Sequence, residues 1–232
     1  MTMRQIVVMG GGGFWEESTP LLDQYILSQS QSTRPRICML PTAQGDSDCY
    51  LVKFYEQYTH LDCAPTHLSL FRPHTADIAD FLLSQDIIFV GCGNTKSMLA
   101  LWREWGVDNI LKQAWDQGIV LSGVSAGSIC WFEQGATDSI PGKILPINAM
   151  GFLKGAVCPH YDGQPERARV VPDYVARGDM KPCLAIDNSC AVRFVNDEIV
   201  DCVSSIPGRT ARMVTADGLQ PDMNSRFLGN GT

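Results

Sequence analysis

Residues 118–134 read GIVLSGVSAGSICWFEQ, and this stretch decides the fold that the sequence predicts. The run GIVLSG is apolar and β-branched, which is typical of a buried strand. The residues AGSICWFEQ that follow have helical spacing, and Gly135 is placed to end the helix. Between the two lies the pattern G-x-S-x-G, which indicates a nucleophile elbow that presents Ser125 at the carboxyl end of the strand. A plain tight turn, with the serine capping the helix, would also produce this pattern.

Strands and helices alternate on the amino-terminal side of this stretch. Apolar runs predict strands at residues 5–9, 36–40, 66–70, 86–90 and 119–122, with helices between them near residues 18–31, 47–60, 75–84 and 95–117. This alternation predicts an α/β fold whose mostly parallel sheet is covered by helices on both faces. The last third holds short strand candidates and a turn at Asn196 and Asp197, which predict antiparallel additions at the sheet edge. We expect a single domain over residues 1–232, with residues 224–232 as a loose tail.

Composition restricts the class of protein. With 232 residues and 45% hydrophobic residues, the chain can bury a large core. A net charge of -7 argues against nucleic acid or an anionic membrane surface as the partner. No apolar run approaches the length of a membrane-spanning helix, and the first apolar stretch is too short for a signal peptide, so we expect a cytoplasmic protein that is a monomer or homodimer. The nine cysteines form no C-x-x-C pair and the four histidines no H-x-x-x-H pair, so we expect buried thiols, no metal and no cofactor.

Two glycine-rich segments follow predicted strands, where the reactive groups of a parallel sheet gather. The first, GGGGFWEES, has Trp15 where a dinucleotide fingerprint needs its third glycine, so we interpret it as a turn that brings the backbone close to the site. The second, GCGN at residues 91–94, is expected to aim N–H groups at the space that Ser125 faces. Gly93 and Ala126 are the predicted oxyanion donors. Thr95 is the predicted N-cap of the next helix.

A serine nucleophile needs a base, and His160 is the predicted one. It ends an apolar strand in AVCPHYDG, whereas the other histidines, at positions 60, 67 and 74, are better explained as surface or packing residues. The acid that orients the base is predicted to be Asp187, which also ends a strand, or Asp138, whose loop would have to fold back toward the elbow. Glu133 lies about 12 Å along the elbow helix, which is too far, and Asp162 is too close in sequence to His160.

Three segments, VGCGNT, GVSAGSICWF and PHYD, give the chain a resemblance to the peptidase E family, which includes α-aspartyl dipeptidase and, more distantly, cyanophycinase. The resemblance covers most of the chain, from the first strand to AIDNSCAV. It implies a three-layer sandwich related to class I glutamine amidotransferases, with serine in place of their cysteine. It also implies that Ser125 is the nucleophile and His160 the base, and it leaves the acid at either Asp138 or Asp187. Cys92 departs from the glycine that the family usually has there.

The expected function is hydrolysis of short peptides by a serine peptidase through an acyl-enzyme. An aspartyl dipeptidase must bind an N-terminal aspartate, which requires a cation close to the nucleophile. Arg167, Arg169 and Arg193 are available, and we name Asn94 and Arg169 as candidate substrate-binding residues. Two other classes stay open: an amidase or transferase acting on a non-peptide amide with the same serine, and a catalytically silent binding protein on the same fold.

Overall fold

A computed structural model describes residues 3–229. Its centre is an eight-stranded sheet with the order β14-β11-β10-β1-β5-β4-β2-β3. The five strands from β1 to β3 in this order run parallel, and β10 and β11 add to the β1 side as antiparallel neighbours. The bounds are β1 (Gln5–Met9), β2 (Arg36–Leu40), β3 (Ala64–His67), β4 (Ile87–Val90), β5 (Val120–Val124), β10 (Cys190–Val195), β11 (Glu198–Ser204) and β14 (Arg226–Phe227).

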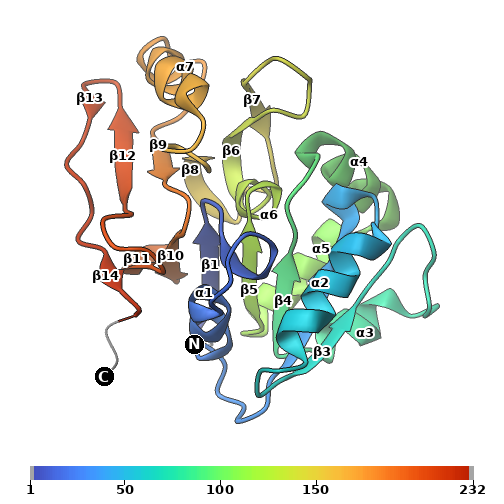
Figure 1. Cartoon of the computed structure of the whole chain (residues 1–232). Coiled ribbons are helices and arrows are strands. Elements are labelled where there is room, and N and C mark those ends of the chain that lie inside the picture. Colours follow the sequence, from blue (N-terminus) through green and yellow to red (C-terminus); the bar gives the residue numbers. More distant parts are fainter. Residues whose placement is uncertain (1–2, 230–232) are drawn as a thin grey trace.

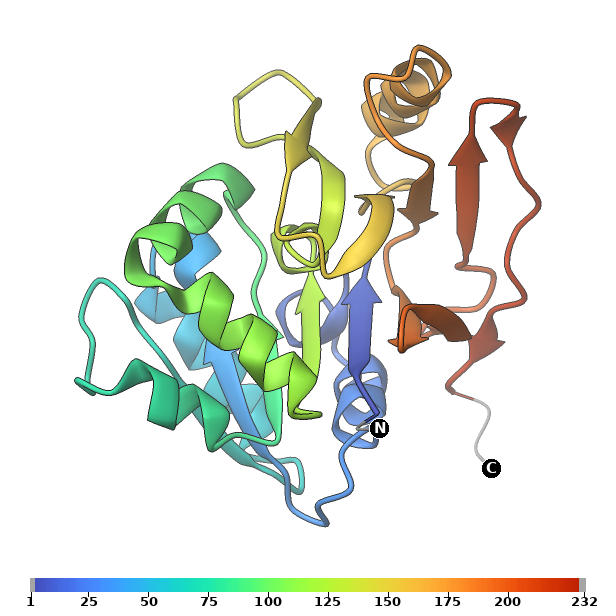
Figure 2. The same ribbon diagram turned by 180° about the vertical axis from the view of Figure 1, so that it is seen from behind.

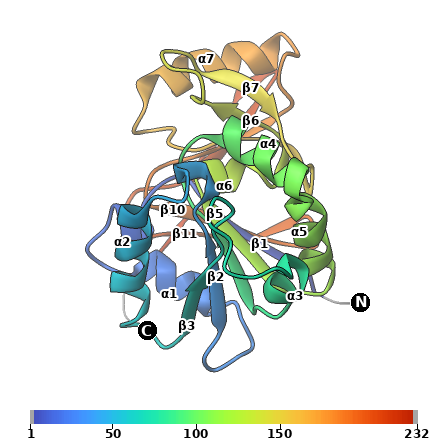
Figure 3. The same ribbon diagram turned by 90° about the vertical axis from the view of Figure 1, so that its right-hand side faces the viewer.

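Helices cover both faces of this sheet, as the alternation predicts. Along β1, Ile6 and Val8 belong to one hydrophobic cluster and Val7 and Met9 to another, because successive side chains of a strand point to opposite faces. Figure 3 shows α1 and α2 on one side of the sheet and α3 and α5 on the other. The helices are η1 (Gly13–Trp15), α1 (Leu21–Leu27), η2 (Thr42–Gln44), α2 (Asp48–Tyr58), α3 (Ile78–Leu83), α4 (Thr95–Trp105) and α5 (Val107–Asp116). The fold class is therefore the predicted α/β sandwich.

A second, six-stranded sheet lies over the carboxyl ends of the central strands (Figure 1). Its order is β13-β12-β9-β8-β6-β7, and one of its faces is covered by α7 (Pro165–Ala176), through contacts that include Val171 and Cys183. Its other face joins the central cluster, and seen from behind it stands above β1 and β5 (Figure 2). The bounds are β6 (Phe132–Thr137), β7 (Leu145–Asn148), β8 (Leu153–Cys158), β9 (Cys183–Ile186), β12 (Ala211–Thr215) and β13 (Gly218–Leu219).

Several predicted elements differ from the observed ones. The helix predicted over 95–117 is broken at Gly106, which has φ +68 and serves as the C-cap of α4. The elbow helix α6 (Ala126–Ile129) has only four residues, because the chain enters β6 at Phe132. The last third contains α7, which the sequence reasoning missed, since Pro172 interrupts its helical pattern.

The carboxyl-terminal part of the prediction is right about the turn and wrong about the tail. Asn196 and Asp197 both have positive φ and connect β10 to β11. Residues 224–232 were expected to be loose, but β14 pairs with β11 within this segment, and residues 230–232 lie outside the described part. None of the helices among residues 3–229 combines the length and apolar character that crossing a bilayer requires.

Candidate active site

Ser125 occupies a sharp turn between β5 and α6, as the G-x-S-x-G pattern predicts. Its backbone has φ 57 and ψ -109, a conformation that costs a non-glycine residue roughly 1–3 kcal/mol. The Ser125 N–H donates to the Met9 carbonyl at 3.2 Å, which fastens the turn to the end of β1. The residue is only partly buried, and its hydroxyl makes no hydrogen bond within residues 3–229.

The two glycines of the pattern are required by close packing of backbone on backbone. A Cβ on Gly123 would lie 2.3 Å from the Gly127 carbonyl oxygen, and a Cβ on Gly127 would lie 2.1 Å from the Val90 carbonyl oxygen. Both distances are far below any contact that a side chain tolerates. The small residues therefore allow α6 to start against β4 and β5, and this placement produces the strained turn at Ser125.

Ser128 stabilises the elbow through buried hydrogen bonds to the backbone. This residue is fully buried, and its Oγ lies 2.6 Å from the Met9 carbonyl and 2.8 Å from the Gly123 carbonyl, either of which can accept its proton. The same oxygen accepts the Met9 N–H at 2.9 Å. One hydroxyl thus satisfies backbone groups of β1 and β5 at the point where the regular ladder ends.

His160 follows β8 and lies beside the glycine-rich turn after β1. A Cβ on Gly11 would lie 2.9 Å from His160 Nδ1, while Ser125 bonds Met9 two residues earlier in the same segment. His160 also has positive φ, at 63. No hydrogen bond joins Ser125 and His160 among the described residues, so their pairing as nucleophile and base remains a prediction. Such bonds are commonly long until substrate binds.

The partner of the His160 ring is Asn188, not the predicted Asp187. His160 Nδ1 lies 2.7 Å from Asn188 Oδ1. The Asp187 carboxylate instead lies 3.0 Å from Arg212 and accepts the Thr210 N–H at 3.3 Å. The expected contact between Asp187 and His160 is therefore wrong. The Asp187 side chain points away from the histidine, toward β12, and burial raises the pKa of its carboxyl.

Asp138 does not contact the ring either. It is exposed at the end of β6, where it pairs with Arg167 at 3.4 Å. Arg167 is 1% exposed and also donates to the Ala136 carbonyl at 2.6 Å, so α7 delivers a buried cation beside the site. From the sequence alone, Arg167 is one of three available arginines, with Arg169 and Arg193. The spacing of this residue on α7 could have marked it as inward-facing, had the helix been predicted.

The pKa of His160 is lowered from the ordinary value of 6.5. Burial of the ring is the largest cause, because it disfavours the charged form, and the Arg167 guanidinium acts in the same direction. The hydrogen bond with Asn188 and the charges of Glu16 and Asp138 partly oppose this shift. A neutral imidazole at neutral pH is the form that a general base requires.

The predicted oxyanion donors face no competing acceptor. Gly93, with φ +128, follows β4, and Ala126 opens α6; neither N–H donates a hydrogen bond within residues 3–229. Cys92, between Gly93 and the strand, donates its N–H to the Tyr50 hydroxyl at 3.2 Å and accepts from Gln44 through Sγ. The side chain that departs from the family pattern is thus packed against neighbouring residues.

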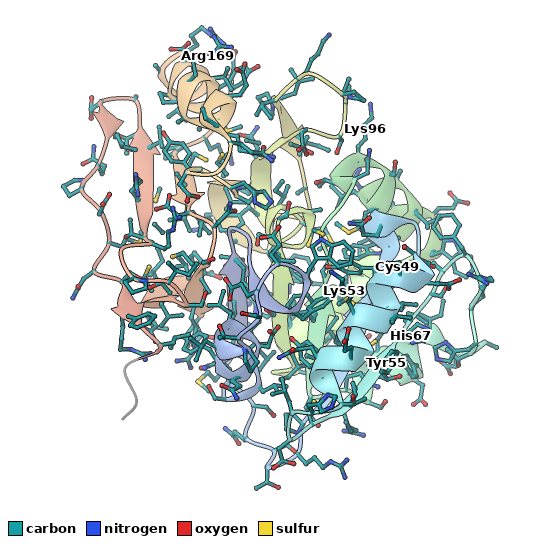
Figure 4. All side chains as sticks on the ribbon, viewed as in Figure 1. Cys49, Lys53, Tyr55, His67, Lys96 and Arg169 are labelled. Carbon is teal, nitrogen blue, oxygen red and sulfur yellow. The ribbon has the colours of Figure 1, made fainter. Side chains whose placement is uncertain are left out.

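The two predicted substrate-binding residues are engaged elsewhere. Asn94, and not Thr95, caps α4: its Oδ1 accepts the Ser97 N–H at 2.9 Å and its Nδ2 donates to the Ser139 carbonyl at 3.0 Å. Arg169 lies on the outer side of α7, where it is exposed and pairs with Glu166 (Figure 4). Both polar groups of the Asn94 side chain are thus used within the protein, and the Arg169 guanidinium is paired with Glu166.

The other three histidines have structural partners, as expected. His67 lies beside Tyr55, and its Nδ1 is 2.8 Å from the tyrosine hydroxyl (Figure 4). His74 packs edge-on against Phe81, and His60 Nδ1 lies 2.6 Å from the Glu56 carbonyl of α2, the helix that His60 follows. Across the described residues, no group of three or more His, Cys, Asp and Glu side chains is arranged to hold a metal ion.

Comparison with known proteins gives matches over nearly the whole chain. The model of Peptidase family S51 matches residues 6–201. The uncharacterized peptidase YgaJ of Bacillus subtilis (strain 168) is 48% identical over 213 residues, which cover 91% of this chain and 92% of that protein.

Two solved structures are similar in fold. A peptidase from an acI-B1 Actinobacterium superposes with a TM-score of 0.72 at 15% identity, covering 95% of this chain and 93% of that one. A putative peptidase E protein from Listeria monocytogenes EGD-e superposes with a TM-score of 0.65 at 16% identity, covering 86% and 98%.

Proposed function

The chain belongs to peptidase family S51, and we propose that it is a serine peptidase in which Ser125 is the nucleophile and His160 the general base. The observation that carries the proposal is the elbow itself. Ser125 is held at positive φ by close backbone packing, and its hydroxyl is unbonded within residues 3–229. Its N–H bonds the carbonyl of Met9, two residues before Gly11, the glycine that lies beside His160. A serine that served only as a helix cap would bond the first turn of α6, and Ser125 makes no such bond.

The proposed reaction uses an acyl-enzyme. His160 Nε2 accepts the Ser125 proton while Oγ forms a bond to the carbonyl carbon of the peptide. The N–H groups of Gly93 and Ala126 stabilise the negative charge on the carbonyl oxygen. The peptide C–N bond then breaks, His160 returns the proton to the leaving amine, and water releases the acyl group by the same route in reverse.

We propose short peptides with a free amino end as the substrates, and Glu16 as the carboxylate that attracts this amine. Glu16 is exposed, and its Oε2 is fixed by the Gly12 N–H at 2.7 Å, one residue from the glycine that packs on His160. Its charge acts on the His160 ring, where it partly opposes the lowering of the pKa. Glu16→Gln should raise KM for a free dipeptide several-fold and leave that for the N-acetylated form unchanged.

A requirement for N-terminal aspartate is not favoured by the charges near Ser125. Arg167 is the cation whose charge acts on the His160 ring, and it is buried and already bound to Asp138 and the Ala136 carbonyl. The β-carboxylate of a substrate would have to compete with Asp138 for it. We therefore expect Ala-Xaa dipeptides to be hydrolysed at least as well as Asp-Xaa dipeptides.

A fluorophosphonate label and a panel of dipeptides test the proposal together. The wild-type protein should be labelled at Ser125 and should cleave members of the panel, and Ser125→Ala should lose labelling and about 10⁶-fold in turnover. Labelling without cleavage of any peptide would instead favour an amidase or transferase. The complete absence of labelling would favour a catalytically silent binding protein.

A further inference from the structure

A serine–histidine pair needs a third group to hold the ring, and neither predicted acid serves. Asp187 is bound to Arg212 and Thr210, and Asp138 to Arg167. We propose that Asn188 is the positioning residue for His160, so that a neutral amide stands where a carboxylate is usual. The assignment concerns the same site as the proposed peptidase and, for its catalytic consequence, rests on that function.

The fold makes room for this one side chain on both sides. A Cβ on Gly11 would lie 2.3 Å from Asn188 Oδ1, and a Cβ on Gly163 would lie 2.3 Å from its Nδ2. Two glycines from different loops therefore enclose the amide, and a larger residue at either position would displace it. The amide is thus held in place by packing as well as by its bond to the histidine.

A network behind Asn188 fixes its backbone. The Asn188 N–H donates to Asp162 Oδ1 at 2.7 Å, and the other oxygen of Asp162 pairs with Arg209. Asp162 lies two residues after His160, so one carboxylate ties the loop that carries the base to the loop that carries its partner. This carboxylate acts on the Asn188 backbone and does not bond the His160 ring itself.

The chemistry follows from what an amide oxygen can do. Oδ1 can only accept, so it holds the proton on Nδ1 and leaves the Nε2 lone pair available for the Ser125 proton. An amide orients the ring but adds no negative charge to stabilise the imidazolium. The charged groups that act on the ring are Glu16 from the segment after β1, Asp138 from the end of β6 and Arg167 from α7.

Two substitutions separate orientation from charge. Asn188→Ala should lower kcat by about 10²-fold or more with little change in KM, because the ring loses its fixed tautomer. Asn188→Asp restores an acceptor and adds a charge in contact with the ring, so it should recover much of the activity and move the acidic limb of the kcat/KM profile up by about one pH unit or more. Asn109→Ala, on the exposed side of α5, is the matched control and should behave as wild type.

A measurement on the resting protein keeps the proposal distinct from the peptidase assignment. In ¹⁵N-histidine spectra, His160 should be the Nδ1–H tautomer in the wild type and a mixture of tautomers in Asn188→Ala. If the wild type neither labels nor cleaves peptides, the proposed function fails while the tautomer still decides the role of Asn188. An Nε2–H tautomer in the wild type, or an Asn188→Ala variant within two-fold of wild-type kcat, would overturn the proposal.

Discussion

At the scale of single residues, the candidate site is built from backbone conformations that most side chains avoid. Ser125 and His160 both have positive φ, at 57 and 63. Each conformation is unfavourable in isolation, and each persists because the surrounding packing determines it. For Ser125 that packing is the contact of Gly123 with Gly127 and of Gly127 with Val90. The strain is therefore maintained by close backbone contacts that only glycine at positions 123 and 127 permits.

Gly127→Ala should damage both stability and reactivity. Its new Cβ would lie 2.1 Å from a backbone oxygen of β4, which cannot move aside as the tip of a side chain can. We expect a loss of roughly 1–3 kcal/mol in urea unfolding and a large fall in the rate of fluorophosphonate labelling at Ser125. Gly142→Ala is the control: no atom lies within 4 Å of its Cβ, so its only cost is that of placing alanine at φ +75, about 1 kcal/mol. Equal effects of the two substitutions would contradict the packing argument.

At the scale of elements, α1 and α2 meet through a buried carboxyl. Asp23 of α1 is fully buried and accepts the Tyr58 hydroxyl of α2 at 2.8 Å, while its second oxygen has no partner within residues 3–229. Burial raises the pKa of Asp23 to about 6, and the hydrogen bond from Tyr58 only partly opposes the shift. The two helices are thus joined by an acid that the folded state prefers to keep protonated.

This raised pKa predicts a specific dependence of stability on pH. The folded-state pKa lies above the unfolded one, so the contribution of Asp23 is fully present below about pH 4 and is lost as the pH rises to about 6. The shift corresponds to a loss of about 3 kcal/mol in the free energy of unfolding across that interval. Asn cannot ionise, so Asp23→Asn should remove this part of the pH dependence. Denaturant unfolding of both proteins between pH 4 and 7 measures this dependence. The same change in unfolding free energy with pH in both proteins would contradict the assignment.

At the scale of the whole molecule, the two sheets share one hydrophobic cluster. Phe132 at the start of β6 packs edge-on against Phe194 of β10, with ring centroids 5.7 Å apart, and both are buried. Leu153, Leu184 and other residues of the second sheet belong to the same cluster as the central strands. The second sheet therefore stands over the carboxyl ends of the central strands because it buries apolar surface there, and β8, which His160 follows, belongs to this sheet.

This shared cluster predicts that the chain unfolds as one unit. Such unfolding is what the single domain expected from the sequence requires. Phe132→Ala should lower the unfolding free energy by about 3–5 kcal/mol and shift one cooperative transition as a whole. Phe71→Ala, at a position 61% exposed, should have little effect. Calorimetry decides the matter. A second transition, with only one of the two shifted by Phe132→Ala, would mean that the sheets unfold separately.

Most of the central sheet and the elbow could be predicted from the sequence because their signals are local. A buried parallel strand is a short apolar run, and the turn at Ser125 needs small residues within the five positions from Gly123 to Gly127. The assignment of His160 as the base also used local information, since the residue ends an apolar run just before a turn. These features depend on neighbours in the chain, so the chain displays them directly.

Other features were decided only by the tertiary structure. Asn188 meets His160 across 28 residues, and whether position 187 or 188 faces the ring depends on the alternation of side chains in a strand end that pairs with β12. The burial of Arg167 depends on how α7 packs on the second sheet, and the shortness of α6 depends on Phe132 finding a place in that sheet. The sequence by itself determined the fold class, the nucleophile elbow and the candidate serine and histidine. The partner that holds the histidine was decided by the packing of loops distant in sequence. The reason is that neither composition nor periodicity shows which of two adjacent side chains faces the ring.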